Sequence, residues 1–300
     1  MIDYRALISA FRLRTLPLAL SSVALGCFLA YVAGRFSITV ALLAALTTLF
    51  LQILSNLAND YGDSSHGTDN EKRIGPVRAV QSGAITPAQM KKVVILFIVL
   101  SLVSGIGLVI AGTKGTGGLS AVFFLLLGLG AIMAAVKYTV GKNPYGYAGF
   151  GDLFVFLFFG LAGVTGTYWL HTHTFRWDIL LPASAMGFLS TGVLNMNNMR
   201  DRENDRESGK YTLVVRMGIE KARWYHLFLL VASVLSGSAY MLLNYHSPFQ
   251  MLFLITLPML WINAVTVFRN RRPEELDPWL RKLALTSLLF SLAFGIGLLF

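Results

Sequence analysis

Nine stretches of the sequence, each 18 to 22 residues long, contain no Asp, Glu, Lys or Arg. At about 1.5 Å per residue, a helix of this length crosses a hydrocarbon core of about 30 Å. Barrel strands would alternate polar and apolar side chains, and these stretches do not. We therefore expect an all-α integral membrane protein, in which residues 1–300 form one membrane domain built as a bundle of nine transmembrane helices. The expected spans are 15–33, 38–58, 93–113, 118–136, 153–170, 179–199, 224–243, 247–268 and 283–300.

Composition excludes the other broad classes of protein. Charged residues make up 13% of the chain, against roughly 25% in soluble globular proteins. The 55% share of hydrophobic residues and the 12% share of aromatic residues exclude a disordered chain. The single cysteine, Cys27, excludes a disulfide framework.

Basic residues divide unevenly between the two sides that nine spans define. The N-terminus and the loops after the second, fourth, sixth and eighth spans hold 22 of the 25 Lys and Arg, and the other side holds Arg35, Lys114 and Arg176. Because cytoplasmic loops are enriched in Lys and Arg, we expect a cytoplasmic N-terminus and an extracytoplasmic C-terminus, in the inner membrane of a bacterium. The asymmetry accounts for the net charge of +10, so we expect membrane lipid but no nucleic acid among the partners.

Acidic residues gather on the same side, although the positive-inside rule does not require it. Fourteen of the fifteen Asp and Glu lie there, and Asp178 is the exception. Most belong to the two loops after the second and sixth spans, and each loop begins with a cluster that has an Asn one helical turn before the first Asp. The clusters are Asn56, Asp60 and Asp63, at i, i+4 and i+7, and Asn197, Asp201 and Asp205, at i, i+4 and i+8.

This pattern favours a magnesium and diphosphate site. Carboxylate and amide oxygens are hard ligands that suit Mg²⁺, whose coordination is completed by water and phosphate oxygens. Two acidic helix ends that face each other would hold Mg²⁺ between them and a diphosphate, and nearby Lys and Arg would bind the remaining phosphate oxygens. A lone Asp-x-x-Asp is usually a solvated loop sequence, but two matched clusters beside spans favour the ligand hypothesis.

The two clusters resemble the Asn-Asp-x-x-Asp and Asp-x-x-x-Asp motifs of the UbiA superfamily of intramembrane aromatic prenyltransferases. Three further segments look like the menaquinone-pathway branch of that family, and the likeness covers nearly the whole chain. The segments are Arg73-Ile-Gly-Pro, Tyr138-Thr-Val-Gly and Pro144-Tyr-Gly-Tyr-x-Gly-x-Gly-Asp152. The family pattern often has a third Asp four residues after the second, whereas Asp69 follows Asp63 by six, so Asp69 is not among the expected ligands.

The resemblance implies an activity. A polyprenyl group would pass from a polyprenyl diphosphate to 1,4-dihydroxy-2-naphthoate, with Mg²⁺ as cofactor and loss of CO₂ and diphosphate, to give a demethylmenaquinol. The alternative within the family is a 4-hydroxybenzoate polyprenyltransferase of the ubiquinone pathway. A secondary transporter is disfavoured, because its acids would lie at the membrane midplane rather than at one face.

The resemblance also implies roles for individual residues. Asp60, Asp63, Asp201 and Asp205 would be catalytic and hold Mg²⁺. Tyr138 would support the allylic cation through its ring, unless it is an interfacial anchor. The residues expected to bind substrate are Asn56, Asn197, Lys72, Arg73, Arg78, Lys142, Asp152 and Lys210. For the bases among them the positive-inside rule is an alternative explanation, and for Asp152 a helix-start charge is another.

Overall fold

The computed structural model describes residues 3–70 and 73–300, and within these ranges every regular element is helical. Nine helical segments in the described ranges are long and apolar enough to cross a membrane, which confirms the predicted fold class. The elements are α1 (Tyr4–Ala10), η1 (Leu13–Thr15), α2 (Leu16–Val32), α3 (Ile38–Ser65), α4 (Pro87–Gly112), α5 (Gly118–Lys137), α6 (Gly151–Val155), η2 (Phe156–Gly166), α7 (Thr167–Thr172), η3 (Trp177–Ile179), α8 (Leu180–Glu207), α9 (Leu213–Met217), α10 (Ile219–Leu243), η4 (Pro248–Thr256), α11 (Leu257–Arg269), η5 (Pro273–Leu276) and α12 (Asp277–Gly297).

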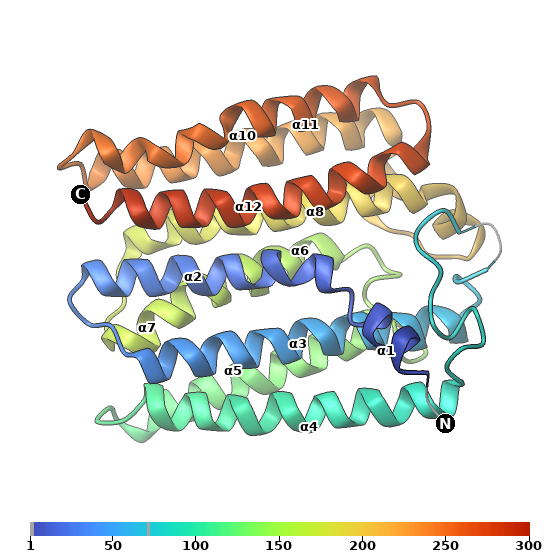
Figure 1. The fold of residues 1–300 in the computed structure, drawn as a ribbon, viewed down its shortest axis with the longest axis horizontal. Coiled ribbons are helices and arrows are strands. Elements are labelled where there is room, and N and C mark those ends of the chain that lie inside the picture. The colour runs from blue at the N-terminus through green and yellow to red at the C-terminus, as the bar shows by residue number, and fades with distance from the viewer. Residues whose placement is uncertain (1–2, 71–72) are drawn as a thin grey trace.

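The spans run side by side, and the N- and C-terminal ends lie at opposite ends of the bundle (Figure 1). The loops that follow α3, α5, α8 and α11 all lie at the end that holds the N-terminus (Figure 1). The alternation of loops along the chain therefore agrees with the odd number of spans predicted from the sequence. The polar loop sequences with most of the charge are brought to this one end.

Helix starts follow local sequence signals. Ser37 caps α3 by accepting a hydrogen bond from the Val40 amide, and Thr86 with Gln89 forms a capping box at the start of α4. Neither α3 nor α8 ends at the edge of its apolar stretch. Each continues for several residues and so carries its acidic cluster on rigid helix.

The core is centred on α8, the most buried of the spans. It packs against η2, α10 and α12, and its contact with η2 is close because both helices carry glycine there. A Cβ on Gly160 would lie 2.5 Å from the Gly187 Cα. The η2 segment itself is a π-helix of 11 residues, a form that is frequent at functional sites.

Candidate active site

A cavity of about 370 Å³ lies inside the bundle. Its wall is polar at the end that holds the N-terminus and apolar deeper in the bundle. The polar lining residues include Arg12, Asn56, Asn59, Asp63, Arg78, Tyr138, Asn197 and Lys210, and the apolar ones include Leu51, Leu108, Phe124, Phe158 and Leu170. The cavity therefore combines a charged end with an apolar channel.

One face of α3 runs along this cavity. Its lining residues Gln52, Asn56, Asn59 and Asp63 are separated by four, three and four positions, the spacing of a single helix face. Asp60 lies one position further round the helix, and it is not among the described lining residues. Asp63 is therefore the carboxylate that α3 presents to the cavity.

Asp63 is buried among three partners from different segments. Its Oδ1 accepts a hydrogen bond from the Tyr147 hydroxyl at 2.9 Å, and its Oδ2 pairs with Arg78 Nη2 at 2.9 Å. Lys210 Nζ lies 3.7 Å from Oδ1. These contacts bring the end of α3, the loop before α4, the loop before α6 and the loop after α8 to one point.

Lys210 joins the two acidic clusters. Its Nζ lies 3.6 Å from Asp205 Oδ1 and 5.5 Å from the centre of the Tyr147 ring. Burial lowers the pKa of Lys210, but the Asp205 and Asp63 carboxylates outweigh burial and raise it above its ordinary value. The ammonium is therefore charged at neutral pH, between carboxylates from α3 and α8.

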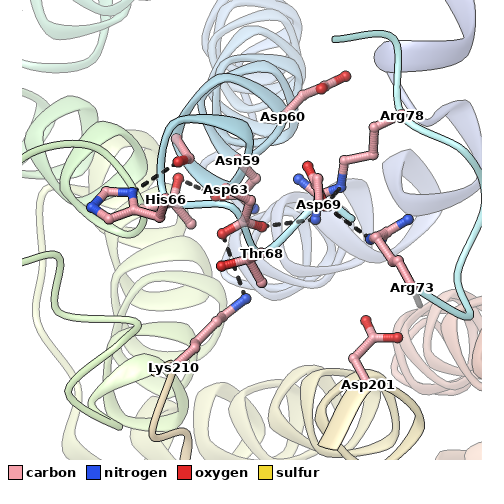
Figure 2. A network of polar contacts seen from close by, with 12 residues as sticks. Asn59, Asp60, Asp63, His66, Thr68, Asp69, Arg73, Arg78, Asp201 and Lys210 are labelled. Carbon is pink, nitrogen blue, oxygen red and sulfur yellow. Dashed lines mark hydrogen bonds and ion pairs between the residues drawn. The ribbon is translucent and has the colours of Figure 1, made fainter. Parts of the chain in front are cut away.

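The loop before α4 folds over this group through its arginines. Asp69 pairs with Arg73 at 3.0 Å and with Arg78 at 3.1 Å, and all three side chains are less than 10% exposed (Figure 2). Burial lowers the pKa of Arg78, but Asp63 and Asp69 raise it, and the net change is upward. Asp69 was not among the ligands expected from the sequence, and the structure places it as the partner of both arginines.

Asp60 is turned toward the backbone of the same loop. Its Oδ2 accepts a hydrogen bond from the Ala79 amide at 3.0 Å, and its Oδ1 accepts one from the Val80 amide at 3.2 Å. Figure 2 shows the Asp60 side chain pointing away from Asp63 and Lys210. The sequence pattern predicts a metal ligand at this position, and the structure gives both of its oxygens backbone partners.

The second cluster is also engaged by a base. Arg200 donates to Asp201 through Nε at 2.8 Å and through Nη2 at 2.7 Å, and Nη2 also donates to Asn197 Oδ1 at 2.9 Å. The Arg200 side chain is 1% exposed and pairs with Asp277 at the start of α12. Asp277 in turn pairs with Arg14 at 2.8 Å. Arg200 thus links Asp201 to the C-terminal span.

The remaining predicted residues are not all brought together. Tyr138 lines the cavity, and burial raises its pKa to about 12, so that the phenol is neutral. Asp152 is buried beside Tyr225 of α10 and is not among the described cavity residues. Lys142 is exposed in the loop before α6. Lys72 lies outside the described residues.

Sequence reasoning gave no role to Arg12, Asn59 or Tyr147. Arg12 lines the cavity in a left-handed backbone conformation with φ of 50°, and its buried Nη2 has no hydrogen-bond partner among the described residues. The sequence does contain a signal for Asn59, because it lies three positions after Asn56 and four before Asp63 and so shares their helix face. No spacing rule relates Tyr147 to Asp63, because 84 residues separate them.

The Asp and Asn side chains near the ends of α3 and α8 bring several oxygen atoms together. Among the described residues, the buried oxygens Asp205 Oδ2 and Asn204 Oδ1 have no hydrogen-bond partner. In the described part of the chain, no three side chains of His, Cys, Asp and Glu are arranged to hold a metal ion. Four of the carboxylates are instead paired with Lys or Arg, namely Asp63, Asp69, Asp201 and Asp205.

Comparison with known proteins gives matches over nearly the full chain. Residues 19–291 match the UbiA prenyltransferase family. The 1,4-dihydroxy-2-naphthoate octaprenyltransferase of Escherichia coli is 44% identical over 98% of this chain and 95% of its own length. The enzyme of the same name from Haemophilus influenzae is 45% identical over 96% of this chain and 94% of its own length.

A solved structure has the same fold. It is a UbiA homologue from Archaeoglobus fulgidus bound to DMAPP and Mg²⁺, with a TM-score of 0.60 and 18% identity. The match covers 95% of this chain and 99% of that one. At this level of identity, the likeness establishes the arrangement of the helices.

Proposed function

The chain belongs to the UbiA prenyltransferase family, and from this premise we propose that it transfers a polyprenyl group from a polyprenyl diphosphate to 1,4-dihydroxy-2-naphthoate. The products are a demethylmenaquinol, CO₂ and diphosphate. The observation that carries the proposal is the cavity, which joins a charged end to an apolar channel. A prenyl diphosphate has the same division, with a highly charged head and a long hydrocarbon tail.

The relatives support the naphthoate as the acceptor. Both bacterial enzymes described above are named for it, and each is aligned over more than nine-tenths of this chain. The ubiquinone-type alternative, which uses 4-hydroxybenzoate, has no comparable support.

A donor set beside the charged end of the cavity fits Mg²⁺. Asp63 lines the cavity, and Asp205, which is outside the described lining, approaches the same Lys210 ammonium from another helix. Asp205 Oδ2 and Asn204 Oδ1 are buried oxygens with no hydrogen-bond partner among the described residues. Hard oxygen donors of this kind suit Mg²⁺. We propose that Asp63 and Asp205 hold the ion; the solved homologue bound to DMAPP and Mg²⁺ supports a metal requirement. When bound, Mg²⁺ would supply positive charge to the departing diphosphate.

Basic side chains would bind the diphosphate oxygens. Arg78 and Lys210 line the cavity beside Asp63, and Arg73 is held next to them by Asp69. Fixed cations in a buried site stabilise the charge that develops as the C–O bond breaks, because they need no reorganisation. The ring of Tyr138 lines the same end and would face the allylic cation.

Loss of the acceptor carboxyl group removes the need for a strong base. If the ring attacks the cation at the carbon bearing the carboxylate, rearomatisation releases CO₂ rather than a ring proton. No histidine is among the described residues that line the cavity. The histidine at the end of α3, His66, contacts the carbonyl oxygens of Gly62 and Gly141 through its ring nitrogens. The site therefore suits an acceptor that loses CO₂.

Loop charge supports a location for this chemistry. The end of the bundle that holds the charged cavity mouth also carries the base-rich loops. We propose that this end faces the cytoplasm of a bacterium, that Phe300 lies on the opposite side, and that the prenyl tail extends among the spans or into lipid.

The purified protein in proteoliposomes tests the proposal. With Mg²⁺ and a polyprenyl diphosphate, it is offered equal amounts of 1,4-dihydroxy-2-naphthoate and 4-hydroxybenzoate, and the products are identified by mass. The expected product is the decarboxylated prenyl naphthalenediol. Preferential prenylation of 4-hydroxybenzoate would assign the protein to the ubiquinone-type branch.

A further inference from the structure

We propose that Asp60 is a positioning residue: it fixes the loop that carries Arg78 over the cavity, and Asp63 alone is the α3 carboxylate offered to the metal and diphosphate. The inference rests on the proposed function for the identity of the ligands. It does not rest on that function for the geometry, which belongs to the chain itself.

Each carboxylate oxygen of Asp60 accepts a hydrogen bond from a backbone amide. The carboxylate is 2% exposed and accepts the Ala79 and Val80 amides, one on each oxygen. Its partners are thus two successive backbone donors rather than a mobile base. The carboxylate is also outside the described lining of the cavity, so a metal ion bound to it would compete with the two buried amides for its oxygens, which is costly.

The two amides begin a turn, which explains why they need an outside acceptor. The Ser82 amide donates to the Arg78 carbonyl at 2.9 Å, and the Ile85 amide donates to the Ala79 carbonyl at 3.0 Å. The amides at the start of such a turn have no carbonyl before them to pair with. Asp60 therefore caps this turn from another helix, in the way a side chain caps a helix start.

The cap acts on the residue next to it. Arg78 directly precedes Ala79, and its guanidinium contacts Asp63 at 2.9 Å and Asp69 at 3.1 Å. Asp60 and Asp63, one turn apart on α3, therefore hold neighbouring positions of one loop: Asp60 holds the backbone and Asp63 the side chain. Loss of the backbone contact would free Arg78 from the cavity mouth without removing a cavity-lining group.

Amide hydrogen exchange of the purified full chain tests this without any acceptor substrate. The peptide covering 74–85 is followed in the wild type, in Asp60→Asn and Asp60→Ala, and in Asp205→Asn as the matched control. We expect exchange at Ala79 and Val80 to rise about tenfold or more in Asp60→Ala, because a charged hydrogen-bond partner is lost. Asp60→Asn, which keeps one acceptor oxygen, should show a smaller rise, and Asp205→Asn should match the wild type.

Addition of Mg²⁺ with farnesyl thiolodiphosphate, a stable analogue of a prenyl diphosphate, gives the second arm. If Asp60 keeps its backbone partners, protection of the two amides in the wild type is unchanged or greater after addition. If the ion bound Asp60, it would compete with the two amides for the carboxylate, and faster exchange at Ala79 and Val80 after addition would overturn the proposal.

Kinetics separate positioning from ligation in the same variants. For Asp60→Asn we expect a higher KM for the prenyl diphosphate with an unchanged Mg²⁺ activation constant, whereas Asp205→Asn should raise that constant about tenfold or more. In an Arg78→Ala background, Asp60→Asn should add less than about twofold, because coupled residues are not additive. An increased Mg²⁺ requirement in Asp60→Asn together with normal exchange at 79–80 would overturn the proposal. A failure of the protein to prenylate the naphthoate would leave the exchange result unaffected.

Discussion

Arg78 Nη2 lies 2.9 Å from Asp63 Oδ2, in a buried contact that joins the loop before α4 to the end of α3. The same guanidinium reaches Asp69 through Nε at 3.1 Å. One planar group thus holds two carboxylates at the mouth of the cavity. The arrangement leaves a cation fixed in place where a diphosphate would bind.

Arg78→Lys tests this planar contact. Lysine keeps the charge but has no fork to reach both carboxylates, so we expect turnover to fall about tenfold or more, because loss of a buried ion pair leaves a carboxylate without its partner. The measurement is steady-state turnover with saturating acceptor. Arg206→Lys is the control, because Arg206 is 57% exposed and pairs only with Glu203 among the described residues. Equal turnover by the two variants would contradict the proposed role of the Arg78 guanidinium.

Removal of the metal should stop the reaction. If Asp63 and Asp205 hold Mg²⁺, EDTA should abolish prenyl transfer and excess Mg²⁺ should restore it. Ca²⁺ should restore less, because it is larger and coordinates less rigidly. Product formation is measured by mass before and after each addition. Full turnover in EDTA is incompatible with the metal role of the two carboxylates.

Gly62→Ala should destabilise the protein, because Gly62 sits against Thr139. A Cβ at Gly62 would lie 2.5 Å from Thr139 Oγ1 and 2.7 Å from its carbonyl oxygen. Overpacking of this kind costs about 1–3 kcal/mol, which should appear as a lower midpoint of thermal unfolding in detergent. Gly130→Ala is the matched control, since no atom outside its own helix lies within 4 Å of a Cβ there. Equal midpoints of thermal unfolding for the two variants would contradict the close approach of α3 to Thr139.

A reporter fused after Phe300 tests the orientation of the bundle. From the base-rich loops and the nine spans found in the described residues, we propose that this end lies outside the cytoplasm. A reporter that is active only in the cytoplasm should therefore be silent, and one that is active only outside should give signal. Strong cytoplasmic activity would reverse the proposed orientation.

The fold could be predicted from the sequence because the membrane imposes a length and a polarity on each span. The stretches without charged residues predicted the transmembrane helices, and the Lys and Arg of the loops predicted which loops lie on the same side. The shared face of Asn56, Asp60 and Asp63 depends on the helix continuing past residue 58, and α3 does continue, through Ser65. The π-helical form of η2 was not predictable, because a π-helix has no recognisable periodicity in the sequence.

The site was predictable in its chemistry but not in its pairings. Matched Asn and Asp clusters indicated a cation and diphosphate site, and the structure brings Asp63 and Asp205 to one lysine. The direction of each side chain depends on tertiary contacts instead. Asp60 is turned away by two amides of a loop about 20 residues later, and no local pattern specifies that contact.

The fate of the acceptor carboxyl group tests the central claim most directly. The protein in proteoliposomes is supplied with Mg²⁺, a polyprenyl diphosphate and 1,4-dihydroxy-2-naphthoate labelled in its carboxyl carbon, and the label is followed into gas and product. The proposed function predicts one labelled CO₂ for each prenylated demethylmenaquinol formed and no label in the quinol. A prenylated product that keeps the label would contradict it.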